Sequence, residues 1–392
     1  MNVCRITHGL VLLLPLALAC GTSTPGEGGS SESTSSSSSS GGIHENPDAG
    51  SNTVPAPELG TGDHSAASVT LTLIADEDDG LNVPRDLEFH PQRQEELWIV
   101  NRADDSTVTV FHPGTDERSV VKKVDAYALH FMEEVSSIAF GAPNTFATCQ
   151  ESTNRYNNQA PSGNLFMGPA LWTADFSVYA VADPIGLGSH LDMLHESPLC
   201  MGIAWVEGNK YWTFDGYDSA LVLYDFQEDH GAGYDDHSDG IIHRYAEGEV
   251  KREPNVPSHM EYDHDEGMLY VADTGNSRII RMDPSTATPG QSLPAKEDGT
   301  VHRRYDGATI EVIVSVDSGL LDMPSGLALH NGLIYVTDHG DSRISAFNKQ
   351  GERVNYLETG LPSGSLMGLT FGPDGKIYFV DADQNRVFRI DP

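Results

Sequence analysis

Short runs of alternating apolar and polar residues recur along the chain from about residue 68 to its C-terminal end. The clearest stretch spans residues 324–351, with the sequence PSGLALHNGLIYVTDHGDSRISAFNKQG. Two alternating runs there flank Asn331-Gly332, and a third run follows a polar turn. Asn-Gly between two such runs is a strong signal for a β-hairpin, so the pattern predicts successive short strands. One unit of this size cannot bury both faces of its sheet, and we therefore expect several copies of it.

Six copies of this unit are present, each with a first run and a second run that ends at a polar residue. The first runs start at Pro84, Val135, Cys200, Pro257, Pro324 and Leu366, and the second runs end at Asn101, Gln150, Asp215, Asp273, Asp338 and Asp381. The shorter intervals between copies are typical of a four-stranded propeller blade, and the longer ones indicate insertions in loops. The sequence therefore predicts an all-β protein whose fold is a six-bladed β-propeller. Residues 68–74 alternate but have no blade of their own, so we expect them to supply the outer strand of the last blade and close the ring.

Three copies resemble NHL repeats. They are residues 273–283 (DTGNSRIIRMD), 338–348 (DHGDSRISAFN) and 381–391 (DADQNRVFRID). The resemblance covers roughly residues 68–392 and implies a six-bladed NHL-type propeller. Within this pattern we expect the leading Asp to accept hydrogen bonds from the backbone of the turn that it starts, in preference to binding a cation.

The N-terminal residues have the features of an export signal and a tether. Residues 1–19 carry Arg5 and then an apolar run that is too short to span a bilayer, which predicts a signal peptide. The stretch Ala17-Leu18-Ala19-Cys20 resembles the lipobox of bacterial lipoproteins, which implies a lipid on Cys20 and an outer-membrane location; ordinary cleavage near Ala19 is the alternative. Residues 20–64 are rich in Ser and Gly, so we expect a disordered linker that anchors a propeller at residues 65–392 to the membrane.

Charge and cysteine content narrow the picture further. With 58 acidic and 23 basic residues, the formal net charge of −35 repels phosphate backbones and argues against a nucleic-acid partner. General solubility explains this charge, and cation binding at particular acidic loops is the alternative. Cys149 and Cys200 remain once Cys4 and Cys20 are set aside, and they lie at the same level of neighbouring blades. In an exported protein we expect them to form a disulfide. We expect a monomer.

Histidines near the starts of the innermost strands are candidates for metal ligands. We call the face of the propeller on which these strands begin the start face; the second strand of each blade returns to it. His190, His195 and His259 project towards it, and the segment 190–196, HLDMLHE, combines two imidazoles with two carboxylates. Such groups suit zinc. Structural histidines held by hydrogen bonds are the alternative.

A glycine-rich acidic loop, residues 228–240 (EDHGAGYDDHSDG), should lie on the opposite face. Oxygen ligands on a flexible loop suit calcium, although the spacing is not that of an EF-hand, and a merely solvated hairpin is the alternative. The candidate ligands are Asp229, Asp235, Asp236, His237 and Asp239.

The histidines also resemble, faintly, the peptidylglycine amidating lyase branch of these propellers. This resemblance implies a zinc held by His195 and His259, with Arg85 binding a substrate carboxylate and Tyr217 acting as acid or base. The starts of the fifth and sixth blades, at Ser325 and Met367, depart from the motif of that family. Gluconolactonase-like propellers are another enzyme class, but their first-blade glutamate motif has no counterpart here.

Together these features predict a cell-envelope lipoprotein whose propeller binds a small molecule or an envelope protein through its loops. The alternatives are a metal-dependent lyase or hydrolase, with zinc or calcium as its cofactor, and a structural surface protein without a ligand. The sequence identifies neither the ligand nor the metal.

Overall fold

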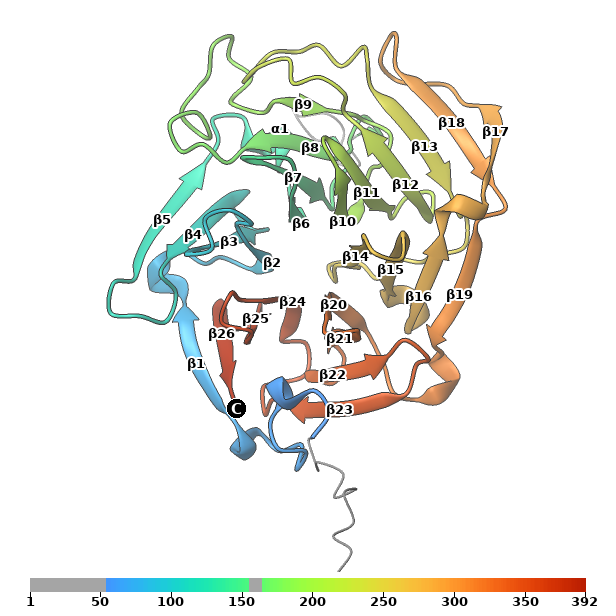
Figure 1. Cartoon of the computed structure of the whole chain (residues 1–392). Coiled ribbons are helices and arrows are strands. Elements are labelled where there is room, and N and C mark those ends of the chain that lie inside the picture. The colour runs from blue at the N-terminus through green and yellow to red at the C-terminus, as the bar shows by residue number, and fades with distance from the viewer. Residues whose placement is uncertain (1–53, 155–163) are drawn as a thin grey trace, which may run out of the picture. The chain divides into compact units, whose positions relative to one another are not determined.

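The computed structural model describes residues 54–154 and 164–392, which form six β-sheets arranged radially around a central axis (Figure 1). This arrangement confirms the predicted six-bladed β-propeller. The first three blades, each from its innermost strand outwards, are β2 (Pro84–Phe89), β3 (Glu96–Asn101), β4 (Ser106–Phe111) and β5 (Ser119–Val124); β6 (Val135–Phe140), β7 (Thr145–Gln150), β8 (Ala170–Thr173) and β9 (Asp192–Met193); and β10 (Cys200–Glu207), β11 (Lys210–Asp215), β12 (Ala220–Asp225) and β13 (Ile241–Tyr245).

The remaining blades follow the same order, and the described residues also contain short helices, two of them before β1 and the others between strands. The blades are β14 (Met260–Asp263), β15 (Met268–Asp273), β16 (Arg278–Asp283) and β19 (Thr309–Val314); β20 (Pro324–His330), β21 (Leu333–Asp338), β22 (Arg343–Asn348) and β23 (Arg353–Glu358); and β24 (Leu366–Phe371), β25 (Ile377–Asp381), β26 (Arg386–Asp391) and β1 (Thr70–Ala75). The helices are α1 (Ala128–Phe131) and the 3₁₀ turns η1 (Pro57–Leu59), η2 (Ala66–Ser68), η3 (Glu77–Asp79), η5 (Thr274–Asn276), η6 (Pro284–Thr286) and η7 (Val316–Ser318). None of the helices within residues 54–154 and 164–392 has the length and apolar character that a membrane span requires.

Strand β1 closes the ring, as the sequence predicts. It pairs antiparallel with the C-terminal strand β26, with Thr72 opposite Arg389, and lies outside that strand (Figure 1). The last blade is therefore built from both ends of the described chain. This pairing covers the edge of β26, which would otherwise present unpaired backbone groups.

The core of the propeller consists of apolar layers between neighbouring blades. Trp98 of the first blade is fully buried and packs against Phe140 and Phe146 of the second, with ring centres 5.6 and 5.2 Å apart. Trp172 and Trp212 are similarly buried in the second and third blades. The alternating pattern places these large side chains on the faces of each sheet, where a neighbouring blade covers them.

The polar residues that end the second strands stabilise turns, as expected. Asp215 accepts hydrogen bonds from the backbone amides of Tyr217 (2.9 Å) and Asp218 (3.0 Å) and pairs with Arg244. Asp273 and Asp381 pair with the arginines that follow them by five residues. The ring of acids on the start face is thus structural.

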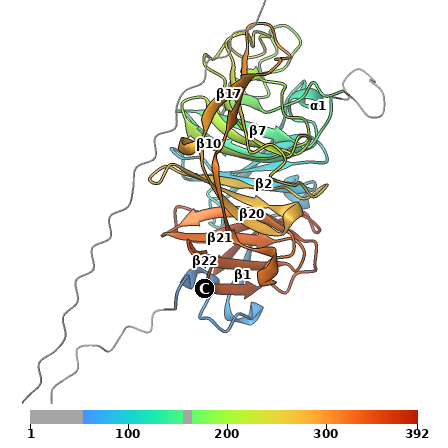
Figure 2. The same ribbon diagram turned by 90° about the vertical axis from the view of Figure 1, so that its right-hand side faces the viewer.

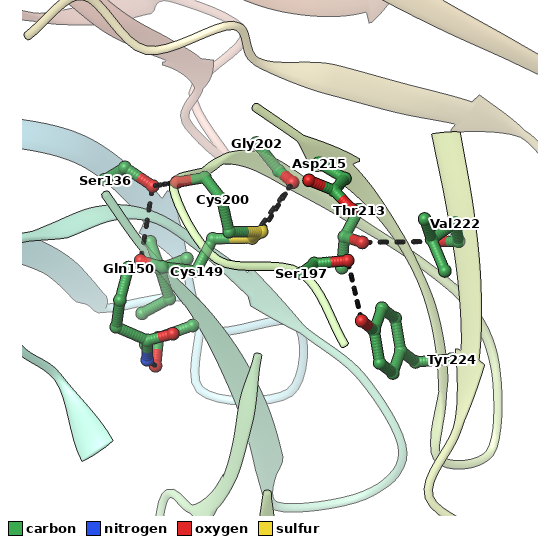
Figure 3. The surroundings of a disulfide bond; sticks show 12 residues. Ser136, Cys149, Gln150, Ser197, Cys200, Gly202, Thr213, Asp215, Val222 and Tyr224 are labelled. Atoms are coloured by element: carbon green, nitrogen blue, oxygen red, sulfur yellow. Dashed lines mark hydrogen bonds between the residues drawn. A yellow bond between two sulfur atoms is a disulfide. The ribbon is translucent and has the colours of Figure 1, made fainter. Parts of the chain in front are cut away.

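A buried disulfide joins the second blade to the third. Cys149 in β7 and Cys200 at the start of β10 are bonded, with their Cα atoms 5.2 Å apart, and both side chains are inaccessible to solvent (Figure 3). The hydroxyl of Ser136 donates to the carbonyl oxygens of Cys149 (3.2 Å) and Cys200 (2.8 Å). The predicted disulfide is therefore confirmed.

The extra hairpin formed by β17 (Thr288–Ser292) and β18 (Val301–Asp306) is absent from the sequence prediction. The chain leaves the fourth blade after β16, and β18 pairs in parallel with β13 of the third blade before β19 completes the fourth. The hairpin lies at the outside of the ring (Figure 1), and its strand β17 faces the viewer when the molecule is turned by 90° (Figure 2). The third sheet consequently has six strands.

The folded body also begins earlier than the predicted boundary at residue 65. Leu59 is fully buried, and the side-chain amide of Asn355 in β23 donates to the carbonyl oxygens of Pro55 and Ala56. The ring of His64 stacks on Tyr356 with centres 3.8 Å apart. Residues 55–64 therefore belong to the propeller rather than to the linker. The predicted signal peptide, Cys20 and the rest of the predicted linker up to residue 53 lie outside the described residues.

Candidate functional site

A small pocket of about 270 Å³ lies on the start face, where the central channel opens. It is lined by loops and strand starts of several blades, namely Arg85, Pro254, Asn255, Val256, His339, Gly364, Met367, Ala382 and Asp383. Because these residues come from four different blades or the loops between them, the closed ring alone brings them together. We call this the mouth pocket.

Arg85 is the residue that distinguishes the mouth pocket. It is the second residue of β2, and only 5% of its surface is exposed. Its Nε atom is buried without a hydrogen-bond partner, and Arg85 forms no ion pair with any residue that the structure describes. Burial, together with the nearby charge of Arg102, lowers the pKa of Arg85 to about 10, so it remains a cation at neutral pH. A buried, unpaired guanidinium is costly unless another group supplies the missing charge.

Two further arginines beside Arg85 are already neutralised. Glu151 accepts from Nη1 of Arg252 (2.9 Å) and from the backbone amide of Asn255 (2.8 Å), while Nε of Arg102 lies 3.8 Å from its other oxygen. Arg102 also pairs with Glu134 at 2.9 Å. Glu134 and Glu151 are therefore engaged with Arg102 and Arg252, and neither forms an ion pair with Arg85, although their charges act to raise its pKa. Asp383, which also lines the pocket, accepts a hydrogen bond from the side-chain amide of Gln384 (2.7 Å).

Below the mouth, the channel narrows to a cavity of about 160 Å³ that contains carboxyl groups. Burial and the neighbouring charge of Glu261 raise the pKa of Glu88 well above its ordinary value. Burial raises the pKa of Glu261 to about 8. His259 lies in the same wall, with Nε2 3.2 Å from the carbonyl oxygen of Ser136 and 3.6 Å from Asp86. The channel thus favours protonated carboxyls beneath a cationic mouth.

A second group of polar residues, here called the histidine cluster, lies at the outer side of the second and third blades. It contains His130, His190, His195 and His237, all of them buried. The ring centre of His237 is 6.2 Å from that of His190 and 5.7 Å from that of His195, which is 5.7 Å from that of His130. The structure therefore joins two segments that the sequence analysis assigned to opposite faces. The two segments do not lie on opposite faces, because the loop 228–240 folds back onto residues 188–195, where the amide of Gly233 donates to the carbonyl oxygen of His190 (2.7 Å).

Each of three rings in the histidine cluster is held through its Nδ1 atom. His190 Nδ1 donates to the carbonyl oxygen of Leu187 (3.0 Å), His195 Nδ1 contacts Glu297, and His237 Nδ1 lies 2.5 Å from Asp192. The Nε2 atoms of His190 and His195 are buried without a partner. Burial lowers the pKa of His190 to about 3 and that of His130 to about 4. Burial opposes the charged form of His237 as well, but the bond to Asp192 raises its pKa overall.

The five predicted calcium ligands do not converge on one point. Asp229 and Asp236 accept hydrogen bonds from their own turns, from the amides of Gly231 (2.7 Å) and Ser238 (3.2 Å). Asp235 lies 3.0 Å from Nε2 of His237. Asp239 instead joins two residues outside the predicted set: ligand atoms of Asp192, His230 and Asp239 lie within 4.8 Å of one another. The loop thus contributes to two neighbouring groups.

The residues of the predicted lyase centre are distributed over different places. Arg85 and His259 both line the central channel or its mouth. His195 belongs to the histidine cluster, and Tyr217, which is 51% exposed, lines a separate pocket of about 410 Å³ with Glu196 and Lys296. The fold therefore does not bring His195 and His259 together as ligands of a single centre. Lyase activity stays a prediction.

Comparison with known proteins agrees with the fold. Residues 321–347 match the NHL repeat family, within the region where the sequence resembles it most closely. The chain is thus a six-bladed β-propeller with an NHL repeat in its fifth blade. No curated protein matches the sequence.

Solved structures with the same fold are distant in sequence. An auxiliary nutrient binding protein from Bacteroides ovatus ATCC 8483 is 13% identical, with a TM-score of 0.52 over 83% of this chain and 76% of its own. One from Bacteroides thetaiotaomicron VPI-5482 is also 13% identical, with a TM-score of 0.50 over 85% and 74%. The calcium-binding protein regucalcin from Agrobacterium tumefaciens is 15% identical, with a TM-score of 0.43 over 81% and 93%.

The sequence analysis selected Arg85, His190, His195 and His237. It did not predict that Arg85 lies in the mouth pocket while the three histidines lie together in the histidine cluster. Glu297 was missed because it lies in the unpredicted hairpin excursion, 102 residues from His195. Asp192 could have been singled out, since it lies between two candidate ligands in the segment HLDMLHE.

Proposed function

We propose that this protein is an exported binding protein whose propeller captures a small anionic ligand at the mouth pocket. The observation that carries the proposal is the buried guanidinium of Arg85, which has no hydrogen-bond or ion-pair partner among the described residues. A carboxylate or phosphate would supply the missing charge and hydrogen-bond acceptors. A volume of about 270 Å³ fits a small metabolite rather than a peptide or polymer.

The charge distribution of the molecule gives this site selectivity. The chain carries a formal net charge of −35, so an anion is repelled from most of its surface. At the mouth, by contrast, the side chain of Arg85 carries a positive charge. The half-buried His339 lies in the same pocket, with its Nδ1 3.0 Å from the carbonyl oxygen of Leu366. We infer that a small anion binds there through direct contact with Arg85, and that larger polyanions are excluded.

Support for the cellular setting comes from the N-terminal sequence. The apolar run, the lipobox-like stretch and Cys20 favour a lipoprotein of the outer membrane, with the propeller held in the envelope as a monomer. Two Bacteroides proteins described as auxiliary nutrient binding proteins share the fold. A nutrient or another envelope metabolite is accordingly the class of ligand that we propose, and a protein partner is the alternative.

The test is a thermal-unfolding screen with inorganic phosphate, acetate, succinate and gluconate, followed by calorimetric titration of any anion that stabilises the protein. A ligand present at a hundred times its Kd should add about 2.7 kcal/mol to the free energy of unfolding. In the variant Arg85→Met this stabilisation should disappear. The matched control is Arg281→Met, which removes an arginine of β16 that pairs with Glu311 of β19. This variant should retain the stabilisation by the anion.

A second feature of Arg85→Met separates a binding role from a structural one. Because the variant removes a buried charge that has no protein partner, its unfolding temperature without ligand should equal or exceed that of the wild type. A protein destabilised by Arg85→Met, or one whose anion response survives it, would overturn the proposal.

A further inference from the structure

Three side chains able to bind a metal meet where the loop 228–240 of the third blade packs on the second blade. Asp192 belongs to β9, the outer strand of the second blade, while His230 and Asp239 belong to the loop between β12 and β13. One ligand atom from each lies within 4.8 Å of the other two, and no other three His, Cys, Asp or Glu side chains of the described residues meet so closely. We call this group the Asp192 site.

Asp192 is the buried member of the Asp192 site, and one of its oxygens is unsatisfied. The residue is 0% exposed. Its Oδ1 accepts a hydrogen bond from the amide of Met193 (2.6 Å) and lies 2.5 Å from Nδ1 of His237. Its Oδ2 is buried and has no hydrogen-bond partner within the part of the chain that the structure describes. Such an oxygen is costly to bury, and a cation bound with His230 and Asp239 would supply the missing partner.

His230 and Asp239 already have the spacing of two ligands on one ion. Nε2 of His230 lies 3.1 Å from Oδ1 of Asp239. Metal–ligand distances of about 2.1 Å place neighbouring ligand atoms roughly 3–3.5 Å apart. The other oxygen of Asp239 accepts from the amide of Glu228 (3.2 Å), which orients the carboxylate. The side chains of His230 and Asp239 are 22% and 31% exposed, so an ion can enter from solvent and the two side chains can close on it.

We propose that Asp192, His230 and Asp239 bind one divalent ion of the zinc class, through one oxygen of each carboxylate and Nε2 of the imidazole. Three protein ligands leave a position for water on the exposed side. Imidazole nitrogen favours zinc over calcium, which takes six to eight oxygen ligands. His237 and the amides of Met193 and Glu228 hold the two carboxylates as positioning groups. The calcium site predicted from the sequence shares only Asp239 with this set.

The ion would fasten two segments that have little regular structure of their own. Strand β9 (Asp192–Met193) has two residues and pairs with β8 through two residue pairs. The loop 228–240 contains no strand. Holding such segments in one conformation costs entropy, and an ion bound to both offsets that cost. Zinc should therefore stabilise the contact between the second and third blades.

The test compares two aspartates of the same loop. Asp239→Asn removes a ligand carboxylate, whereas Asp236→Asn makes the same change at a carboxylate that is engaged with Ser238 in its own turn. Zinc is titrated into the metal-free full-length protein in competition with a chromophoric chelator, and we expect one ion per chain in the wild type. Loss of an outer partner alone lowers metal affinity about 10- to 100-fold, so Asp239→Asn should lose at least about 10-fold, and Asp236→Asn should keep the wild-type affinity.

A pair of histidine variants tests the class of ion. His230→Gln should also lower zinc affinity at least about 10-fold, because it removes the imidazole ligand. His112→Gln, which alters an exposed histidine between β4 and β5, should leave the affinity unchanged. Calcium should bind the wild type more weakly than zinc does. None of the four variants alters a cysteine, so zinc held by a thiol would be the same in all of them.

Hydrogen exchange tests the role of Asp192 without a substitution that also disturbs the buried His237. Zinc should slow amide exchange in residues 228–240 and in residues 190–194 around β9, and leave residues 338–348 of the fifth blade unchanged. Equal zinc affinity in the two loop-aspartate variants, full affinity in His230→Gln, tighter binding of calcium than of zinc, or protection confined to the loop would each overturn the proposal. These outcomes do not bear on the mouth pocket, since no residue of the Asp192 site lines it.

Discussion

Individual residues of the central channel make the stability of the protein depend on pH. Burial raises the pKa of Glu261 to about 8, so the folded protein retains a proton that the unfolded chain releases near pH 4.5. A group with a raised pKa in the folded state contributes stability that is present at low pH and lost as the pH rises through the folded value. Between about pH 5 and pH 9 the free energy of unfolding should therefore fall.

The variant Glu261→Gln should reduce this fall, because glutamine cannot ionise. At the alkaline end the variant should be more stable than the wild type by at least about 1 kcal/mol, since one unit of pKa shift corresponds to about 1.4 kcal/mol. Urea midpoints across the pH range would measure this, with the exposed Glu117→Gln as the control that leaves the slope unchanged. If Glu261→Gln and the wild type had parallel pH profiles, Glu261 would be ionised in the folded protein.

At the scale of residues, the sequence predicts which types of side chain belong to a candidate site better than it predicts where these side chains lie in the fold. Arg85 was singled out through a family resemblance, and in the structure its side chain is buried with no ion-pair partner among the described residues. His190, His195 and His237 were selected for their type, but only the folding of loop 228–240 onto residue 190 brings them together. Such a contact between two loops leaves no periodic signal, so alternation of apolar and polar residues cannot reveal it.

At the scale of elements, strands and hairpins follow directly from local pattern. The six pairs of inner strands and the closing strand β1 were predictable, because alternation of apolar and polar residues and antiparallel connection determine them, and Asn331-Gly332 marks one of the turns. The disulfide between β7 and β10 was predictable because these strands bring the two remaining cysteines to the same level of neighbouring blades. The hairpin of β17 and β18 was not. It contains Pro289 and Gly290, which weaken a strand prediction, and its parallel pairing with β13 has no connecting turn.

The segment at residues 55–64 should contribute measurably to stability, contrary to its assignment as linker. Leu59 is fully buried against the fifth and sixth blades, so Leu59→Ala should cost about 2–4 kcal/mol in the free energy of unfolding. Leu73→Ala provides the control, because Leu73 in the neighbouring strand β1 is 48% exposed and its truncation should cost less than about 1 kcal/mol. Denaturant unfolding of both variants measures the difference. Equal effects would mean that the segment is detached in solution.

The disulfide between Cys149 and Cys200 should stabilise the second and third blades relative to the unfolded chain. It links residues 51 positions apart, and a constraint of this length contributes about 2–4 kcal/mol. The double variant Cys149→Ala/Cys200→Ala should therefore unfold at a lower denaturant concentration than the oxidised wild type. A reductant should lower the wild-type midpoint and leave that of the variant unchanged. A wild-type midpoint indifferent to reductant would contradict the bond.

At the scale of the whole molecule, the charge of the chain opposes its compact fold. The 23 basic residues could all be paired and 35 acidic groups would still be left over at pH 7, so repulsion among carboxylates exceeds attraction in the total. Raising the ionic strength from about 0.01 M to 0.15 M shortens the screening length from about 30 Å to about 8 Å and weakens this repulsion. We therefore expect the urea midpoint at pH 7 to rise with sodium chloride.

The same experiment near the isoelectric point provides the control. At about pH 4.5 the net charge is close to zero, so screening should leave the midpoint unchanged or lower it by weakening ion pairs such as Arg252–Glu151. A rise of equal size at both pH values would identify a specific chloride or sodium site instead of general repulsion. Because chloride is itself an anion, Arg85→Met should be measured in parallel: repulsion acts on both proteins alike, whereas an ion in the mouth pocket stabilises only the wild type.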